Sequence, residues 1–223
     1  MPNKQSGFTL VEIAIVLVII GLLLGGVLKG QELINSAKVK NLINDFRAVS
    51  SFVYAYQDRF RALPGDDRDA VGHVGALANA TTPAGSIGNG RINGVWNPLV
   101  ANQTDESYLF WEQVRRANLA SGDPTPGNAA YVYTNADGGP VGITGDAVFT
   151  GAPAWPATFF VCSAGIQGRF ARQIDSTIDD GNTQTGTVRV LGTTAGGTLS
   201  TSATFAALTP AEDSALFTVC VAY

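Results

Sequence analysis

The sequence has little of what most catalytic and metal centres are built from. Its 223 residues include one histidine and two cysteines, and the cysteines do not form a CxxC pair. Two distant thiols without a histidine neighbour make a poor metal site. The histidine, His73, is expected in a glycine-rich loop, with no serine or cysteine constellation around it in the sequence. The sequence therefore favours a protein that is not an enzyme and has no cofactor.

Charge is also scarce, and it is unevenly placed. The formal net charge of -4 provides no general attraction to nucleic acid or anionic lipid. All four lysines precede residue 41, whereas from Arg61 onward eight arginines are outnumbered by fourteen acids. The chain thus has a cationic start and an acidic body, and nucleic acid is not expected as a partner.

One long apolar run lies near the N-terminus. Residues 8–28 read FTLVEIAIVLVIIGLLLGGVL, 21 residues with a single charge. As a helix the run is about 31 Å long, which matches the hydrocarbon core of a bilayer. No small-residue cleavage site follows it, and the helical pattern continues into polar sequence, unlike that of a secretory signal peptide. The run is therefore predicted to be retained as a membrane-inserted helix.

Glu12 is the single charged residue of this run. A carboxylate near the centre of a bilayer costs about 2–3 kcal/mol, less near an end, and usually marks a functional site. Two interpretations are open: the side chain is tolerated beside the lipid headgroups, or it pairs with a cation. The run contains no cation, but cleavage of the chain before Phe8 would create one, the new α-amino group.

The residues around this point resemble a known family. Residues 4–12 read KQSGFTLVE, which is similar to the processing site of type IV prepilins and pseudopilins: a polar leader ending in glycine, then phenylalanine, Thr-Leu-x-Glu and an apolar run. The resemblance implies cleavage between Gly7 and Phe8 by a membrane aspartyl prepilin peptidase, and N-methylation of Phe8. It also implies that Glu12, the fifth mature residue, helps to register a new subunit in a filament.

Two partners for Glu12 are compatible with this role. Its carboxylate can pair with the α-amine of Phe8 in a neighbouring subunit, and a wrong register would then leave both charges unpaired. It can also pair with Phe8 of its own chain, because the two residues are i, i+4 on a helix.

The resemblance implies a structural subunit of a type IV pilus or a type II secretion pseudopilus. Its partners would be other pilin subunits, the prepilin peptidase and the inner-membrane assembly platform. The precursor would lie among the lipids of the inner membrane and then enter a filament in the periplasm or at the cell surface. Two alternatives stay open: a minor pilin with a priming or adhesive role, and an uncleaved single-span membrane protein with an extracytoplasmic binding domain.

Beyond the apolar run, hydrophobic residues recur every three or four positions as far as Phe60, which predicts a helical stripe. No proline interrupts residues 8–60, and Pro64-Gly65 follows, so one long helix is expected. The predicted organisation is a leader (1–7), a transmembrane or filament-core half of the helix (8–28), an amphipathic half (29–62) and a globular head (63–223).

The head is expected to pack this helix on an antiparallel sheet, an α+β fold of the kind that pilins have. Residues 104–119 predict a short second helix, because acids precede its apolar residues and arginines lie near its end. Runs rich in β-branched and aromatic residues, bounded by turn residues, predict five strands. They cover residues 130–134, 147–150, 158–162, 187–191 and 216–223.

The resemblance also bears on two groups of residues in the head. The family commonly closes its C-terminal region with a disulfide, here Cys162–Cys220; the alternative is two buried free thiols. Some secretion pseudopilins hold calcium in a C-terminal loop, which makes the oxygen-rich run of residues 174–182 a weak candidate for a calcium loop. Its candidate ligands are Asp175, Asp179, Asp180 and Asn182. The spacing does not follow the EF-hand pattern, so an Asp-Gly turn with solvated acids is the favoured interpretation.

Overall fold

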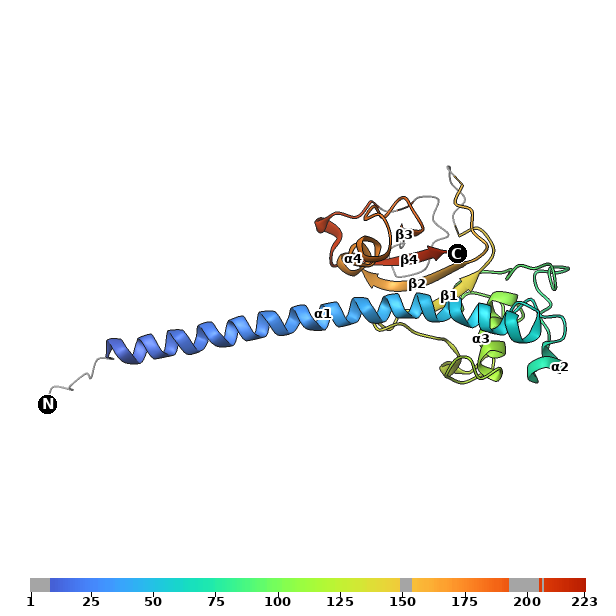
Figure 1. The fold of residues 1–223 in the computed structure, drawn as a ribbon, viewed down its shortest axis with the longest axis horizontal. Helices are drawn as coiled ribbons and strands as arrows, with labels where there is room; N and C mark the ends of the chain where they lie inside the picture. The colour runs from blue at the N-terminus through green and yellow to red at the C-terminus, as the bar shows by residue number, and fades with distance from the viewer. Residues whose placement is uncertain (1–8, 149–153, 193–204, 206) are drawn as a thin grey trace. The chain divides into compact units, whose positions relative to one another are not determined.

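The computed structural model describes residues 9–148, 154–192, 205 and 207–223 (Figure 1). The leader, Gly7 and Phe8 lie outside the described residues. The chain forms two compact units, Met1–Lys40 and Asn41–Tyr223. The helices are α1 (Leu10–Phe60), α2 (Ala70–Val74), α3 (Glu106–Arg116) and α4 (Gly168–Ile178), with short 3-10 turns at Ala129–Tyr131 and Pro210–Glu212. The strands are β1 (Val141–Thr144), β2 (Phe160–Gln167), β3 (Val188–Gly192) and β4 (Leu216–Ala222).

The predicted long helix is confirmed from Leu10 to Phe60, where α1 runs for 51 residues. Its end follows from local chemistry, since Arg61 takes a positive φ of 57° and Pro64-Gly65 comes next. In the second unit the predicted apolar stripe is buried. It consists of Leu42, Ile43, Phe46, Val49, Val53 and Tyr56, while Phe60 is half-buried.

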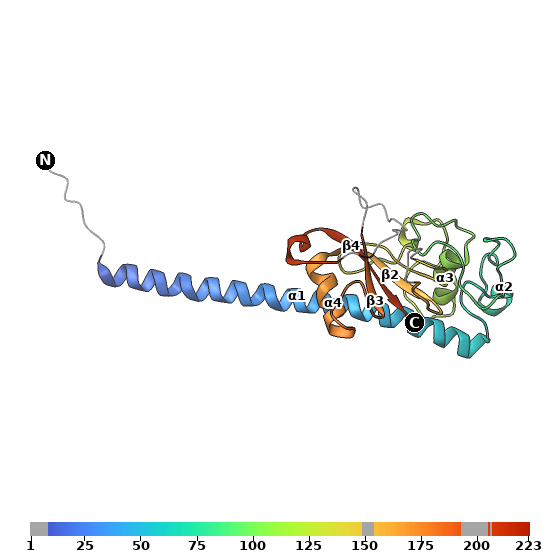
Figure 2. The ribbon, with the colours of Figure 1, turned by 90° about the horizontal axis from the view of Figure 1, so that it is seen from above.

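The sheet has four antiparallel strands in the order β1-β2-β4-β3, so the C-terminal strand lies in the middle (Figure 2). This confirms the expected α+β fold. Side chains alternate across the sheet. Val188 and Val221 face α1 and line one groove with Phe46. The opposite face carries Phe160 and the two cysteines, which belong to a buried cluster with Trp96 and Trp155.

Because both faces of the sheet are covered, β2 and β4 are almost continuously buried. Apolar and polar residues therefore alternate little along their sequences. The predicted strands 187–191 and 216–223 correspond to β3 and β4. The predicted strand 158–162 is too short, because β2 continues to Gln167. The predicted helix at 104–119 corresponds to α3, whose bounds are narrower.

One strand prediction is wrong, and a second finds no strand in its described half. The segment predicted at 130–134 begins with a 3-10 turn instead. Tyr131 is fully buried there, and its hydroxyl donates to the Tyr108 carbonyl at 2.6 Å. Ala147 and Val148 lie outside any strand, and 149–150 fall beyond the described ranges. The strand in this region is β1, whose VGIT sequence follows Pro140 and contains a glycine, so the propensity signal is weak.

α4 was not expected from the sequence. Its buried residues recur on one face, at Phe170, Ala171, Ile174 and Asp175. This face packs against β2, β3 and β4 (Figure 2). The spacing of the apolar residues was a readable helix signal, but Asp175 interrupts it with a charge.

The structure contains the disulfide between Cys162 and Cys220, which are direct cross-strand partners in β2 and β4. Both cysteines are fully buried. The bond closes a loop across a sequence separation of 58 residues that contains α4 and β3. It therefore restrains the unfolded form of most of the sheet.

Replacing both cysteines, Cys162→Ala with Cys220→Ala, should destabilise the head by about 4 kcal/mol through the lost loop restraint. The corresponding fall in melting temperature is about 10 °C. Mass mapping without reduction should recover the two cysteines in one linked peptide. Alkylation of both thiols in the unreduced, denatured protein would contradict the disulfide.

Candidate functional site

The first turn of α1 holds the carboxylate of Glu12. Its Oε2 atom accepts hydrogen bonds from the backbone N–H of Thr9 at 2.7 Å and from the Thr9 hydroxyl at 2.8 Å. The N–H of Glu12 donates in return to the Thr9 hydroxyl at 3.3 Å. Thr9 and Glu12 thus form a reciprocal capping box that satisfies donors at the start of the helix. Both donors to the carboxylate are neutral, so they orient the charge without neutralising it.

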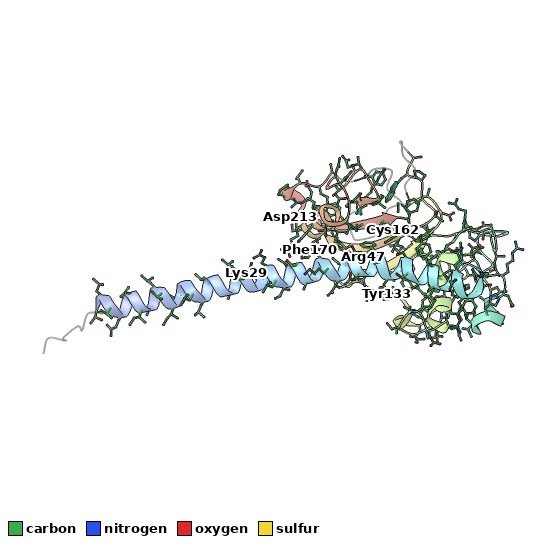
Figure 3. The ribbon with its side chains drawn as sticks, viewed as in Figure 1. Lys29, Arg47, Tyr133, Cys162, Phe170 and Asp213 are labelled. Atoms are coloured by element: carbon green, nitrogen blue, oxygen red, sulfur yellow. A yellow bond between two sulfur atoms is a disulfide. The ribbon has the colours of Figure 1, made fainter. Side chains whose placement is uncertain are left out.

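The residues that follow form an apolar surface around the helix. Every leucine, isoleucine and valine from Leu10 to Leu28 is at least 46% exposed, and their side chains project from several sides of α1 (Figure 3). The helix is long and apolar enough to cross a membrane by length and composition. A surface of this kind in water would be an aggregation site, so it requires lipid or other apolar helices around it.

The comparison with protein families bears on this segment. Residues 2–28 match the family model for the prokaryotic N-terminal methylation motif. The match supports a prepilin of the type IV pilin or pseudopilin type. No curated protein and no solved structure gives a significant match to the chain.

The motif and the apolar helix are consistent with a membrane-anchored precursor, and the motif is typical of structural proteins of the pilin type. Gly7 and Phe8 lie within the matched residues but outside those that the structure describes. Cleavage, methylation of Phe8 and a filament role for Glu12 therefore stay predictions here.

In the second unit, the structure brings together three of the four residues of the candidate calcium loop. Asp175, Asp179 and Asp180 each have a carboxylate oxygen within 4.8 Å of the others. Asp180 lies in the expected turn, because it accepts the N–H of Asn182 at 2.8 Å. The side-chain oxygen of Asn182 accepts from the N–H of Gln184 at 3.2 Å, so this residue supports the turn.

Asp175 differs from the expectation of solvated acids, because its side chain is 0% exposed. It lies on the buried face of α4, next to Ile174. Burial, together with the charges of Asp180 and Asp179, raises the pKa of Asp175 to about 6 from an ordinary value of 3.8.

His73 also differs from the expectation of an isolated loop residue. It lies in α2, and its Nδ1 atom is 2.7 Å from Oδ2 of Asp67. The hydroxyl of Tyr56 donates to the same oxygen at 2.7 Å, and the His73 ring stacks on Phe60. This group joins the end of α1 to the segment after it, and its contacts are those of a structural network.

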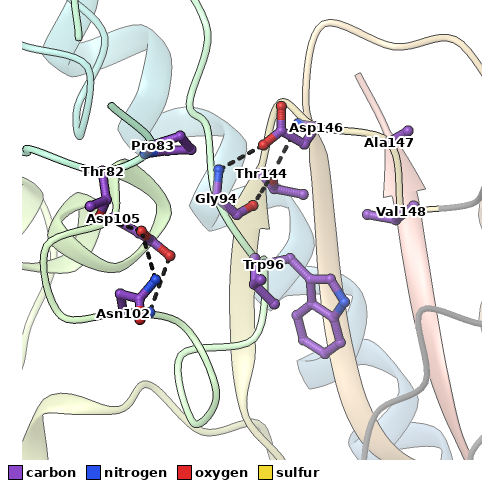
Figure 4. A pocket seen from close by; sticks show the side chains of 11 residues that line it. Thr82, Pro83, Gly94, Trp96, Asn102, Asp105, Thr144, Asp146, Ala147 and Val148 are labelled. Atoms are coloured by element: carbon purple, nitrogen blue, oxygen red, sulfur yellow. Dashed lines mark hydrogen bonds between the residues drawn. The ribbon is translucent and has the colours of Figure 1, made fainter. Parts of the chain in front are cut away.

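A pocket of about 460 Å³ lies between the loops around residues 82–105 and 144–148 (Figure 4). Both of its carboxylates accept hydrogen bonds from backbone N–H groups, Asp146 from the opposite loop and Asp105 from its own. Asp146 accepts the N–H of Gly94 at 2.7 Å, and Asp105 accepts the N–H of Asn102 at 3.1 Å. The described lining residues include no histidine, cysteine or lysine, and the Thr82 hydroxyl donates to Asp105 at 2.5 Å.

The raised pKa of Asp175 predicts a pH dependence of stability. Between about pH 4 and pH 6 the folded chain keeps the proton that the unfolded chain releases, so stability falls as the pH rises through this window. Well above pH 6 the Asp175 carboxyl is ionised in both the folded and the unfolded chain, so its destabilising contribution no longer changes with pH. Asp175→Asn lacks this carboxyl group. In buffer with a chelator, its melting temperature should therefore exceed that of the wild type by a margin that grows from pH 4 to pH 6. At higher pH the margin should stay constant.

The control for this measurement is Asp58→Asn, which removes a carboxylate that is 86% exposed. Its melting temperature should stay parallel to that of the wild type across the same range. If the difference in melting temperature between Asp175→Asn and the wild type were constant from pH 4 upward, the Asp175 carboxyl would not titrate in this window.

Proposed function

We propose that this prepilin is a structural subunit of a type IV pilus or a type II secretion pseudopilus, assembled through its N-terminal helix. The observation that carries the proposal is the match to the methylation motif over residues 2–28. Within this match, the apolar run holds one acid, Glu12, at the fifth position after the predicted cleavage bond.

Processing is the first step of the proposal. A prepilin peptidase cleaves between Gly7 and Phe8, and the new α-amino group is methylated. Residues 1–7 are then the leader, 8–28 the part that leaves the inner membrane for the filament core, 29–62 the amphipathic part of the helix and 63–223 the head. The partners are copies of this chain or other pilins, the peptidase and the inner-membrane assembly platform, and the filament lies in the periplasm or at the cell surface.

Registration of subunits is the second step. When an apolar helix enters a bundle of like helices, the surface from Leu10 to Leu28 exchanges lipid for protein and specifies no register by itself. The carboxylate of Glu12 does specify one, because it is buried at a fixed height and needs a cation. The α-ammonium of Phe8 in a neighbouring subunit supplies it, and any other register leaves two buried charges unpaired.

The capping box with Thr9 supports this role. Charge-assisted hydrogen bonds to a carboxylate are short and directional, so the two donors of Thr9 hold the Glu12 side chain in one rotamer. One carboxylate oxygen, Oε1, is not used by Thr9 and is available to an incoming ammonium group.

Gly7→Val should block processing, because the peptidase requires a small residue before the scissile bond. The expected product is a full-length membrane protein that forms no filaments. Mass spectrometry of the N-terminus measures this directly. Normal cleavage of the variant would contradict the predicted site, and an uncleaved wild type would favour the single-span membrane protein.

Glu12→Ala should be cleaved normally and remain in the membrane, because removal of a charge makes insertion more favourable. Filament yield should nevertheless fall at least about tenfold, since an unpaired buried charge costs well over 1.4 kcal/mol. Glu12→Asp should give an intermediate yield, because it keeps the charge but has a shorter reach.

The matched control is Glu32→Ala on the same helix, whose carboxylate is exposed and pairs with Lys29 at 2.6 Å. This variant should assemble like the wild type. Wild-type filament yield from Glu12→Ala, with intact cleavage, would show that Glu12 is merely tolerated. Loss of cleavage would instead assign Glu12 to peptidase recognition.

A further inference from the structure

The pocket in Figure 4 has mainly apolar walls. The apolar residues that line it are Pro83, Val95, Trp96, Ala147 and Val148. The turn between Trp96 and Asn102 adds two strongly exposed apolar side chains, Leu99 at 64% and Val100 at 57%. A pocket of about 460 Å³ that combines apolar walls with a few polar groups is of the kind that binds a ligand.

Two carboxylates lie in these walls, and the donors that surround them are neutral. Asp105 is 3% exposed and accepts from the Thr82 hydroxyl and from the N–H of Asn102. Asp146 is half-buried and accepts from the side-chain amide of Asn93 and from one backbone N–H, each at 2.7 Å. No described basic residue forms an ion pair with either acid. The pocket is therefore suited to a cation that has an apolar stem.

The side chain of Asp105 is turned away from its usual local role. Asp105 is the N-cap residue of α3, and an aspartate at this position normally accepts an N–H group of the first helical turn. Here the side chain makes no such hydrogen bond. It is directed instead to Thr82 and Asn102, which line the pocket with it (Figure 4). The carboxylate thus belongs to the pocket wall and not to the end of the helix.

A complementary surface lies on α1. All four lysines of the chain precede residue 41. Lys29 already pairs with Glu32 at 2.6 Å, whereas Lys40 is exposed and forms no ion pair with a described residue. Leu33 is 62% exposed and lies seven positions before Lys40, so the two side chains share one face of the helix. This face presents a cation and an apolar side chain together.

We propose that in the filament the pocket of one subunit binds Lys40 of a second copy of this chain. The apolar walls cover the four-carbon stem of the lysine, and its ammonium group pairs with Asp105 and Asp146. Leu33 of the second copy then packs beside the pocket, against exposed apolar residues such as Leu99. The inference rests on the proposed function, because it requires assembled copies, and it adds a contact of the head to the contact at Glu12.

Cross-linking with a carbodiimide tests the contact directly, because this reagent joins an amine to a carboxylate only where the two groups touch. Wild-type filaments should give covalent dimers on a denaturing gel, and mass spectrometry of these dimers should recover Lys40 linked to Asp146 or Asp105. The unassembled chain in detergent micelles should give neither the dimers nor the linked peptides. This comparison separates a contact between subunits from one within a chain.

Variants of the two sides test the energetic coupling. Lys40→Gln should lower filament yield at least about threefold, and Lys40→Arg should restore it because the charge is kept. Asp146→Asn should also lower the yield, and combining it with Lys40→Gln should lower it no further, since the pair is already lost. Lys29→Gln is the matched control on the same helix and should assemble like the wild type. Because Lys40 is exposed, its variants should keep the melting temperature of the unassembled chain.

Three results would overturn the contact. Normal filament yield from Lys40→Gln would show that Lys40 is not needed, and the proposed function would stand. Cross-linked filaments in which Lys40 is joined only to other carboxylates would assign the pocket to a different occupant, again without affecting the proposed function. A wild-type chain that is not cleaved and forms no filaments would contradict the proposed function itself, and the contact with it.

Discussion

The burial of the apolar stripe of α1 on one face of the sheet is the interaction on which the head depends. Leu42, Phe46, Val49 and Val53 are buried, Phe46 beside Val188 and Val221 of the sheet, and each such side chain contributes about 1.5–3 kcal/mol when it leaves water. Without the helix, the inward valines of β3 and β4 would be exposed. The helix that completes this core is also the helix that carries the methylation motif, so folding of the head and anchoring of the chain use one continuous element.

The remaining face of the sheet is completed from distant parts of the sequence. Trp96 comes from the loop before α3, and Trp155 precedes β2. The strand order places β4, the last strand of the chain, between β2 and β3. The sheet is therefore incomplete until the C-terminal residues are in place, and the disulfide between Cys162 and Cys220 holds them there once they pair.

Two carboxylates in the described part of the chain lie among apolar residues. Glu12 lies in the apolar part of α1 with Thr9 as its partner. Asp175 lies on the buried face of α4 with no partner for either oxygen. By contrast, Asp67 and Glu106 are fully engaged within the head. For Glu12 the proposed compensating charge is the α-ammonium group of Phe8 in a neighbouring subunit, whereas burial raises the pKa of Asp175 and favours its protonated form.

The sequence by itself determined the class of the protein, the long helix and its buried stripe. These rest on local patterns: the motif spans adjacent residues, and a helical face repeats every three or four residues. The two C-terminal strands were also readable, because Val188–Gly192 and Leu216–Ala222 are rich in β-branched residues between turn residues. The short strand β1 was not, since its glycine and the preceding proline give little strand signal.

Only the tertiary structure decided the environment of the acids. In the sequence, Asp175, Asp179 and Asp180 are alike, and a glycine nearby favours a solvated turn. The fold places Asp175 on the inner face of α4 and the other two in the loop beyond. Three residues with the same side chain therefore differ in how far they are buried. The strand order was equally beyond the sequence, because it depends on which strands pair across 50 residues or more, as Phe160 does with Ala222. Local sequence patterns determine the helices and strands, whereas long-range packing determines which charged side chains are buried away from water.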